Sequence, residues 1–386
     1  MDVTLHGAGV VRQERPVRGT LHLRAGRVAD TSAGGFAVDL RDHLVFPGLI
    51  NAHEHLHVNA VPPLPMDRPF ANSYDWMAAF QAHFDEPAVK AALARPKACR
   101  MRHGALKNLL AGTTVVAHHD PWDTSLDDAD FPVALLRGYG WAYTLNGPAF
   151  GPDVRASFLA TPPSCPWMIH LAEGTDERAR QECAQLDAMG CLAAHSVLVH
   201  GVGLDAEGID AVIARGASVV WCPASNRRLL GRTLDTRRLH AAGRLGLGSD
   251  SRVSGSRDLL DELGVAVDAG LTPHEAWVLA TAANARILRM PWRGHLGVGA
   301  TADLVIVADR GDAARSLVGL RRADLRAVVR EGRPCVADPD FAPWFEAAGV
   351  DAVAVELDGR PKLLDRRFAD PTLLALEPGL VGERVH

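Results

Sequence analysis

Apolar and polar positions alternate in short stretches along roughly the first 40 residues, where glycines and an Arg-Ala-Gly-Arg segment interrupt them. An apolar residue at every second position is typical of a strand with one buried face, so we expect β-hairpins here rather than helices. The stretches with this pattern are residues 3–5, 20–23 and 35–40. The pattern returns after about Gly294, in residues 302–307, 325–330 and 352–357. Both ends of the chain are therefore predicted to be rich in β-structure.

The middle of the chain alternates between short β-branched runs and longer segments of helical periodicity. The runs predicted to be strands are residues 44–50, 113–117, 141–145, 167–171, 197–200, 217–222 and 245–248. The segments predicted to be helices are residues 88–111, 176–189, 206–215 and 257–269. Such alternation predicts a parallel sheet, either closed into a barrel or open. The closed barrel is favoured, because no GxGxxG turn supports the open, doubly wound form.

These two patterns predict two domains. A barrel of residues 45–294 is joined to one discontinuous β domain, which residues 1–44 and 295–386 form together. Only seven strands of the barrel are clear, so the fourth is expected within residues 147–166, a short stretch rich in proline. We therefore expect a distorted or reduced fourth β/α unit.

Composition and charge narrow the class of protein further. With 47% hydrophobic and 23% charged residues, the chain has the composition of an ordinary globular protein. Its formal net charge of -5 argues against nucleic acid or an anionic membrane as the main partner. No apolar stretch reaches the roughly 18 residues of a membrane helix, and the segment from Met1 to Thr4 does not open a signal peptide. A cytoplasmic location is the default expectation, and the six cysteines, none in a CxxC pattern, fit a reducing compartment.

Histidines at a predicted strand end carry the clearest chemical signal. His53 and His55 follow the apolar run of residues 44–50, and their i, i+2 spacing points both imidazoles to one face of a strand. Two imidazoles at the carboxyl end of a buried strand are typical of a metal site. In a parallel barrel, that end of the strands is the catalytic one. A pair of surface histidines is the alternative that the spacing alone leaves open.

Three further strand ends carry polar side chains of the same kind. His170 is followed three residues later by Glu173, whose carboxylate would reach a water molecule at a metal; a helix-capping glutamate is the alternative. The next predicted strand ends in His200. Asp250 lies among small residues at the tip of another, where an Asx-turn or a helix N-cap would explain it equally well. Together they predict one site at the carboxyl edge of the sheet.

In order along the chain, HxH, His-x-x-Glu, a single histidine and Gly-Ser-Asp-Ser form a set that closely resembles the amidohydrolase superfamily. More narrowly, the set is similar to the aminohydrolase branch that includes cytosine deaminase, S-adenosylhomocysteine deaminase and triazine hydrolases. Further matching segments are residues 47–53, 111–115, 222–226, 280–285 and 299–305. The resemblance spans nearly the whole chain. It implies a distorted (β/α)8 TIM barrel with a small β-sandwich built from both termini, and a homodimer.

The resemblance also implies roles for individual residues. The metal ligands would be His53, His55, His170 and Asp250. His200 would contact the attacking water or the substrate, Glu173 would shuttle protons, and Asp250 would accept the proton of the water. Binuclear members carry a carboxylated lysine at the end of the fourth strand, whereas this chain has no lysine between Lys107 and Lys362. We therefore expect one divalent metal per subunit, with Zn²⁺ favoured by three nitrogens and one carboxylate and Fe²⁺ as the alternative.

The site and the resemblance together predict a metal-dependent hydrolase of small molecules that acts on carbon–nitrogen bonds other than peptide bonds. Hydrolytic deamination of a nitrogen heterocycle or a related amine is the leading interpretation, because Glu173 follows the ligand His170 so closely. Hydrolysis of a cyclic amide, or displacement of halide or alkylamine, is the alternative reaction. A non-catalytic binding relative is a further alternative, which the intact ligand set disfavours.

Substrate contacts are predicted for His119, Trp122 and Asn226. His118 and His119 end the second predicted strand, where one of them faces the pocket, and Trp122 could stack on a flat ring. Asn226 lies in the matching segment 222–226. His57 extends the run to HxHxH and is expected behind the site or at the surface.

Overall fold

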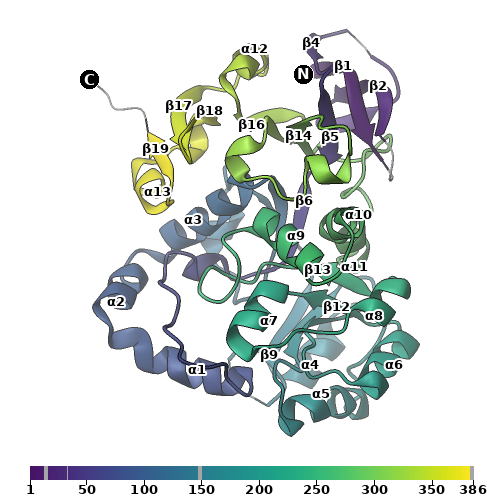
Figure 1. Ribbon diagram of the computed structural model, residues 1–386, viewed down its shortest axis with the longest axis vertical. Helices are drawn as coiled ribbons and strands as arrows, with labels where there is room; N and C mark the ends of the chain where they lie inside the picture. The colour runs from purple at the N-terminus through teal and green to yellow at the C-terminus, as the bar shows by residue number, and fades with distance from the viewer. Residues whose placement is uncertain (13–15, 33, 147–149, 383–386) are drawn as a thin grey trace.

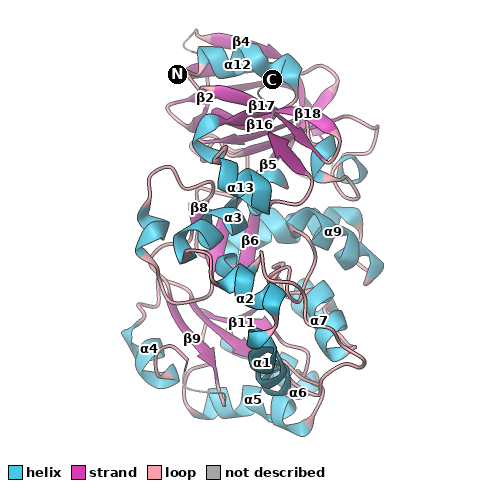
Figure 2. Cartoon of the chain, turned by 90° about the vertical axis from the view of Figure 1, so that its left-hand side faces the viewer, coloured by secondary structure: helices cyan, strands magenta, loops and turns pink. Residues whose placement is uncertain are grey.

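The computed structural model describes residues 1–12, 16–32, 34–146 and 150–382, and the chain forms two parts along its long axis (Figure 1). One part is a sheet made from both ends of the chain, and the other is a set of parallel strands flanked by helices (Figure 2). No helix in these residues is long and apolar enough to cross a bilayer.

The sheet formed by the two ends of the chain has 11 strands in the described residues. From the N-terminal end come β1 (Asp2–Val11), β2 (Pro16–Arg24), β3 (Arg27–Ala29), β4 (Phe36–Asp39) and β5 (His43–Pro47). From the C-terminal end come β14 (Leu304–Ala308), β15 (Ala327–Arg330), β16 (Arg333–Ala337), β17 (Ala352–Leu357), β18 (Arg360–Asp365) and β19 (Leu380–Gly382). The two groups join where β14 pairs with β5 in antiparallel register. The predicted β-rich ends of the chain therefore form one structure.

Strand β14 is buried on both faces, which explains its continuous apolar sequence. Val305 and Val307 belong to the apolar cluster that packs the helices against the parallel strands. Leu304 and Ile306 belong to a second cluster, which includes Trp344 of helix α12 (Ala342–Ala347). Because alternate side chains of a strand point to opposite faces, this part of the sheet is enclosed between the helical part and α12.

The parallel strands form two sheets. The smaller contains β6 (Leu49–Glu54), β7 (Thr113–His118) and β8 (Ala134–Leu135). The larger contains β9 (Gly140–Thr144), β10 (Trp167–Leu171), β11 (Ser196–His200), β12 (Ser218–Trp221) and β13 (Leu245–Leu247). A parallel bridge between Glu54 and Asp250 joins the two sheets. The order β8-β7-β6-β13-β12-β11-β10-β9 is that of eight successive strands around a TIM barrel. The predicted mixed α/β, TIM-barrel-like architecture is confirmed at this level.

The helices begin and end at residues that favour helix termini. They are α1 (Ser73–Ala82), α2 (Pro87–Leu93), α3 (Lys97–Leu110), α4 (Val154–Ala160), α5 (Glu177–Ala188), α6 (Ala206–Arg215), α7 (Pro223–Leu230), α8 (Arg237–Ala241), α9 (Leu259–Asp268), α10 (Pro273–Val278), α11 (Asn284–Ile287) and, in the terminal part, α12 and α13 (Pro371–Leu376). Asp176, Asp205 and Asp258 cap the first turns of α5, α6 and α9 by accepting backbone N–H bonds. The single helix predicted over residues 88–111 is two helices, because Pro96 interrupts it.

The apolar run of residues 44–50 is not one strand, as predicted, but the end of β5 and the start of β6. Gly48 separates them, and a side chain there would collide with Thr114, since a Cβ atom would lie 2.3 Å from Thr114 Oγ1. Residues 45–47 consequently remain in the terminal sheet, so the predicted boundary after residue 44 falls inside a strand. Strand β6, which carries His53, therefore follows β5 of the terminal sheet in the chain with only Gly48 between them.

The reduced unit of the parallel set lies earlier than predicted. Residues 147–149 of the expected fourth strand lie outside the described residues, and residues 150–166 contain helix α4 and no strand. The strand that the sequence pattern did not reveal is β8, which has only 2 residues and pairs with β7. A strand this short has no alternation from which it could be predicted.

Candidate metal centre

The predicted site residues meet at the carboxyl ends of the parallel strands. Their places are His53 in β6, His55 directly after it, His170 in β10, His200 at the end of β11 and Asp250 after β13. Ala172, His200 and Asp250 have positive φ angles of 54°, 75° and 59°, a left-handed conformation that non-glycine residues seldom adopt. Backbone strain of this kind clusters at functional sites, where the surrounding structure holds it in place.

Hydrogen bonds to Nδ1 fix the tautomers of His55 and His170. Nδ1 of His55 lies 2.6 Å from Oδ2 of Asp120, and Nδ1 of His170 lies 2.8 Å from the carbonyl oxygen of Tyr143. Both oxygens accept, so we assign the Nδ1 proton to each ring and direct the Nε2 atoms at the site. These two Nε2 atoms lie 3.2 Å apart. Two lone pairs facing each other at this distance repel unless a positive charge lies between them.

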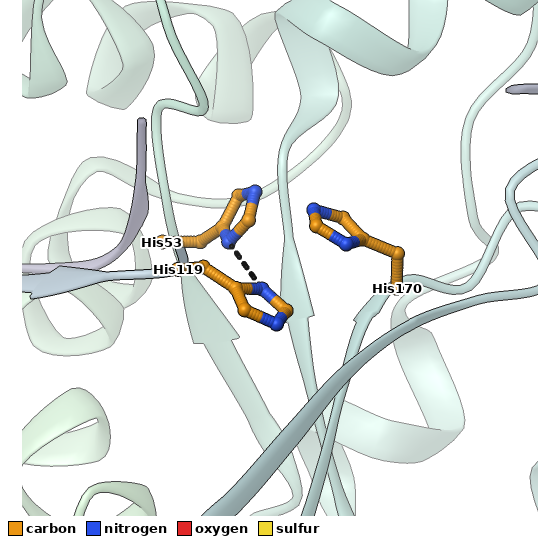
Figure 3. A group of neighbouring side chains, drawn as sticks. All are labelled: His53, His119 and His170. Carbon is orange, nitrogen blue, oxygen red and sulfur yellow. Dashed lines mark hydrogen bonds between the residues drawn. The ribbon is translucent and has the colours of Figure 1, made fainter. Parts of the chain in front are cut away.

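His53 presents a third ring nitrogen to the same point. Its Nδ1 lies 3.3 Å from Nδ1 of His119 (Figure 3). Because Nε2 of His119 donates to the carbonyl oxygen of Ala142 at 3.0 Å, Nδ1 of His119 accepts and the proton of the contact belongs to His53. The remaining Nε2 of His53 is buried and has no hydrogen-bond partner among the described residues. A metal ion at this point would satisfy this nitrogen.

These side chains fit a divalent metal ion. Oδ1 of Asp250 lies 3.8 Å from Nε2 of His53 and 3.6 Å from Nε2 of His55. A tetrahedral Zn²⁺ with bonds of about 2.0–2.1 Å would separate its ligand atoms by about 3.3 Å, close to the distances found here. Three imidazoles and one carboxylate therefore converge with a spacing that suits one ion.

The charges around the cluster favour neutral imidazoles at two positions. Burial, and then the neighbouring histidines, lower the pKa of His53 and His170 well below the ordinary value. Burial also acts to lower the pKa of His55, but Asp120 and Asp250 outweigh it, and the pKa rises to about 9. A proton on Nε2 of His55 therefore competes with a metal ion for the same position.

Hydrogen bonds also orient the two acidic side chains and His200. Hydroxyl groups of Ser225 and Ser254 donate to Oδ2 of Asp250 at 2.7 Å and 2.6 Å, which leaves Oδ1 toward the histidines. Oε1 of Glu173 lies 3.5 Å from Nε2 of His200. Burial, with a smaller contribution from Asp250, raises the pKa of Glu173 above its ordinary value. A buried carboxyl group that holds its proton toward neutral pH is suited to general acid–base catalysis.

A cavity of about 520 Å³ opens onto these groups. Its inner end is lined by His55, His170, Glu173, His200 and Asp250. Its outer wall is apolar and comes mainly from α1 and the residues after it, with Trp76, Met77, Phe80 and Phe84. The rings of Trp76 and Phe80 stack with centroids 5.3 Å apart and an interplanar angle of 5°. The cavity thus combines a polar end with an apolar, aromatic wall.

The three residues predicted to contact substrate lie elsewhere. His119 is buried behind His53, and Asn226 is buried and accepts a hydrogen bond from Nδ1 of His200 at 2.9 Å. Trp122 is 38% exposed and lies under the Arg137 guanidinium, outside this cavity. His119 and Asn226 therefore orient other site residues, and the prediction of substrate contact finds no support at these three positions.

Sequence reasoning missed Asp120, which fixes His55, although it directly follows the His118-His119 pair at a strand end. His57, His118 and Asp120 form a second group whose ligand atoms lie within 4.8 Å of one another. The backbone N–H of Leu56 donates to Nδ1 of His118 at 3.4 Å, which assigns the proton to Nε2, and Arg100 donates to the carbonyl oxygen of His57. In this group, Nδ1 of His118 is thus engaged by the main chain and Oδ2 of Asp120 by Nδ1 of His55.

The amidohydrolase family matches residues 154–335 of the chain. A 5-methylthioadenosine/S-adenosylhomocysteine deaminase of Natronomonas pharaonis is 27% identical over 378 residues, which cover 81% of this chain and 85% of the relative. A 5'-deoxyadenosine deaminase of Methanothermobacter thermautotrophicus is 25% identical and covers 89% of this chain and 95% of its own length. The chain is thus similar to the amidohydrolase family over these residues and to two deaminases over most of its length. The predicted class, a metal-dependent hydrolase acting on carbon–nitrogen bonds, is confirmed by these similarities.

Two solved enzyme structures share the fold. An adenosine deaminase from Xanthomonas campestris with bound zinc has a TM-score of 0.70 at 20% identity, and the match covers 86% of this chain and 92% of that one. Atrazine chlorohydrolase from Arthrobacter aurescens, complexed with zinc, has a TM-score of 0.68 at 19% identity, covering 87% and 95%. Two different leaving groups are thus handled by proteins with this architecture.

Proposed function

We propose that the protein catalyses hydrolytic deamination of an amine-bearing nitrogen heterocycle, with one Zn²⁺ ion held by His53, His55, His170 and Asp250. The observation that carries the proposal is the convergence of three imidazole nitrogens and one carboxylate oxygen beside the Glu173–His200 pair. Fe²⁺ is the alternative metal for this ligand set.

The ion would supply Lewis-acid chemistry, which lowers the pKa of water from 15.7 to about 7. Asp250 lies where it accepts a proton from water at the site, since its Oδ1 faces the histidines. Glu173 then donates a proton to a ring nitrogen as the carbon becomes tetrahedral, and a proton must reach the amine before it leaves as ammonia. The raised pKa of Glu173 keeps this donor protonated closer to neutral pH. His200, fixed by Asn226, orients the attacked carbon or the water.

An aminopurine nucleoside is the substrate class that we propose. The relatives described above are named as deaminases of adenine nucleosides. A cavity of about 520 Å³ with a stacked aromatic wall suits a flat base that carries one substituent. The amine would point to the polar end and the substituent to α1.

Displacement of another leaving group is the second candidate, because a chlorohydrolase has nearly the same fold match as a deaminase. Ammonia release from aminopurines, aminopyrimidines, pterins and amidines, compared with chloride or alkylamine release from triazines, separates the two. Product from lactams alone would favour cyclic-amide hydrolysis. No product from any of them would favour a binding protein.

We also propose that the eight parallel strands close into one distorted (β/α)8 barrel, with the terminal strands as a separate β-sandwich domain. The strand order and the Glu54–Asp250 bridge support closure between the first and last strands. The homodimer implied by the resemblance stays a prediction, which sedimentation would test.

Glu173→Gln tests the catalytic assignment. Because glutamine cannot donate the proton, turnover should fall by about 10²–10⁴-fold, while metal content by elemental analysis stays unchanged. The matched control is Glu177→Gln, the same substitution at an exposed position of α5, which should keep full activity. Full activity in Glu173→Gln would contradict the assigned role.

A further inference from the structure

The first and last parallel strands, β6 and β13, meet at a seam that few main-chain bonds cross. In the described residues the seam has one bridge, and the backbone N–H of Asp250 donates to the carbonyl oxygen of His53 at 3.1 Å. Side-chain amides replace the rest of the ladder. Asn284 bonds to main-chain groups of both strands, and Oδ1 of Asn51 accepts the backbone N–H of Ser249 at 3.0 Å. Three of the four proposed ligands lie beside this seam.

Glu54 lies between His53 and His55, and alternation along the strand points its carboxylate away from the metal cluster. The side chain is fully buried, and Nζ of the equally buried Lys107 donates to Oε2 at 2.6 Å. Six donors surround the two oxygens: Lys107 Nζ, Asn51 Nδ2, Asn59 Nδ2, Asn108 Nδ2, Ser249 Oγ and the backbone N–H of His55. Glu54 is thus bonded both to the main chain of one ligand and to the residue before another.

We propose that Glu54 is a positioning residue of the metal centre, which sets the distance between His53 and His55 on one side of the seam and Asp250 on the other. The inference rests on the metal site proposed above. Glu54 does not line the cavity, so it acts through the ligands rather than on the substrate. Lys107 places an opposite charge directly against this fully buried side chain.

A carboxylate is required here because both oxygens accept. Oε1 accepts from His55 N and Asn59 Nδ2, each at 3.1 Å, and Oε2 accepts from Lys107 at 2.6 Å and Ser249 at 3.3 Å. Glutamine has the same size but would place an NH₂ group among these donors. Either His55 or Ser249 would then lose its contact, and the seam would shift.

Co²⁺ binding tests the role, because the visible absorption of bound Co²⁺ reports ligand geometry. Glu54→Gln should weaken Co²⁺ affinity by about 10–100-fold, as loss of an orienting group does at other metal sites, and should change the absorption bands. The double variant Glu54→Gln/Lys107→Met removes the cation that glutamine leaves unpaired, so it should recover thermal stability without recovering Co²⁺ affinity. Ser249→Ala, a milder change across the seam, should weaken Co²⁺ binding less.

Asp303→Asn is the matched control, because Asp303 is a buried carboxylate paired with Arg293 in the terminal part of the chain. It should lower stability and leave Co²⁺ affinity and spectrum unchanged. Wild-type affinity and spectrum in the double variant and in Ser249→Ala would overturn the positioning role and make Glu54 a purely structural residue. Failure of the wild-type protein itself to bind Co²⁺ would instead refute the metal centre, an outcome visible before any variant is made.

Discussion

Two groups of buried ionisable side chains lie close together in this protein, and their hydrogen bonding differs. At the histidine cluster, Nε2 atoms of His53, His55 and His170 converge with an oxygen of Asp250. At the junction with the C-terminal segment, Glu377 accepts from His103, Arg252 and Arg322, so its charge is fully compensated.

The difference separates a structural charge network from a binding site. Burial acts to raise the pKa of Glu377, but His103 and Arg252 outweigh it and hold the pKa well below the ordinary value. The histidine cluster has more acceptors than donors, so a cation, either a metal ion or the proton of His55, completes it. By residue type alone, both groups are clusters of buried polar side chains. The balance of hydrogen-bond donors and acceptors indicates a ligand-binding site in only one of them, the histidine cluster.

Removal of His53 should produce the largest effect. His53→Ala should reduce bound metal from about one equivalent to near zero and abolish hydrolysis, because the buried Nε2 has no substitute. His103→Ala, a buried histidine of the junction, should keep the metal and lose stability instead. Elemental analysis after dialysis distinguishes them, and stoichiometric zinc in His53→Ala would contradict the ligand assignment.

Glu377→Gln should have the next largest effect, confined to stability. It leaves Arg252 without its carboxylate and Arg322 with Asp358 alone, and breaking a buried pair in this way costs about 3–5 kcal/mol in free energy of unfolding. Urea denaturation measures the loss, with the exposed Glu346→Gln as a control that should be neutral. Loss of the metal from folded Glu377→Gln would remove the distinction between the two groups.

Glu262 is an intermediate case whose effect depends on pH, since it is buried and no cationic side chain pairs with it in the described residues. Burial raises its pKa from 4.5 to about 8. Its folded pKa exceeds the unfolded value, so its stabilising contribution is complete below pH 4.5 and is lost as the pH rises through 8.

Glu262→Gln cannot ionise, so it should become more stable relative to wild type across that window, by at most about 1.4 kcal/mol per pH unit. Thermal unfolding of both proteins at several pH values from 4.5 to 8.5 measures the difference. A difference that does not change with pH would show that Glu262 titrates normally.

The strand ends and the predicted ligands could be located from the sequence because each depends on a local pattern. An i, i+2 pair after an apolar run, and histidines that end successive runs, need no knowledge of distant contacts. Their roles as ligands stay predictions, although the structure brings all four together.

The roles of the supporting residues depend on contacts between distant segments, which local patterns do not contain. Alternation shows that His118 and His119 point to opposite faces but not which one meets His53. In the sequence, Glu54 is only the middle residue of HxH. Its role becomes visible in the folded chain, where Lys107, 53 residues later, donates to it. Gly48 divides an apolar run because of Thr114, a neighbour only in the folded chain.

The pairing of β5 with β14 has a consequence for synthesis of the chain. Val45 lies opposite Ile306, so one edge of β5 remains unpaired until the ribosome has made all of the parallel strands. Domains form largely in order of synthesis, and contacts between distant segments form slowly. The last step of folding should therefore be capture of the early strands by the late ones. Until that step, β5 exposes an apolar edge on which chaperones would act and through which nascent chains would aggregate.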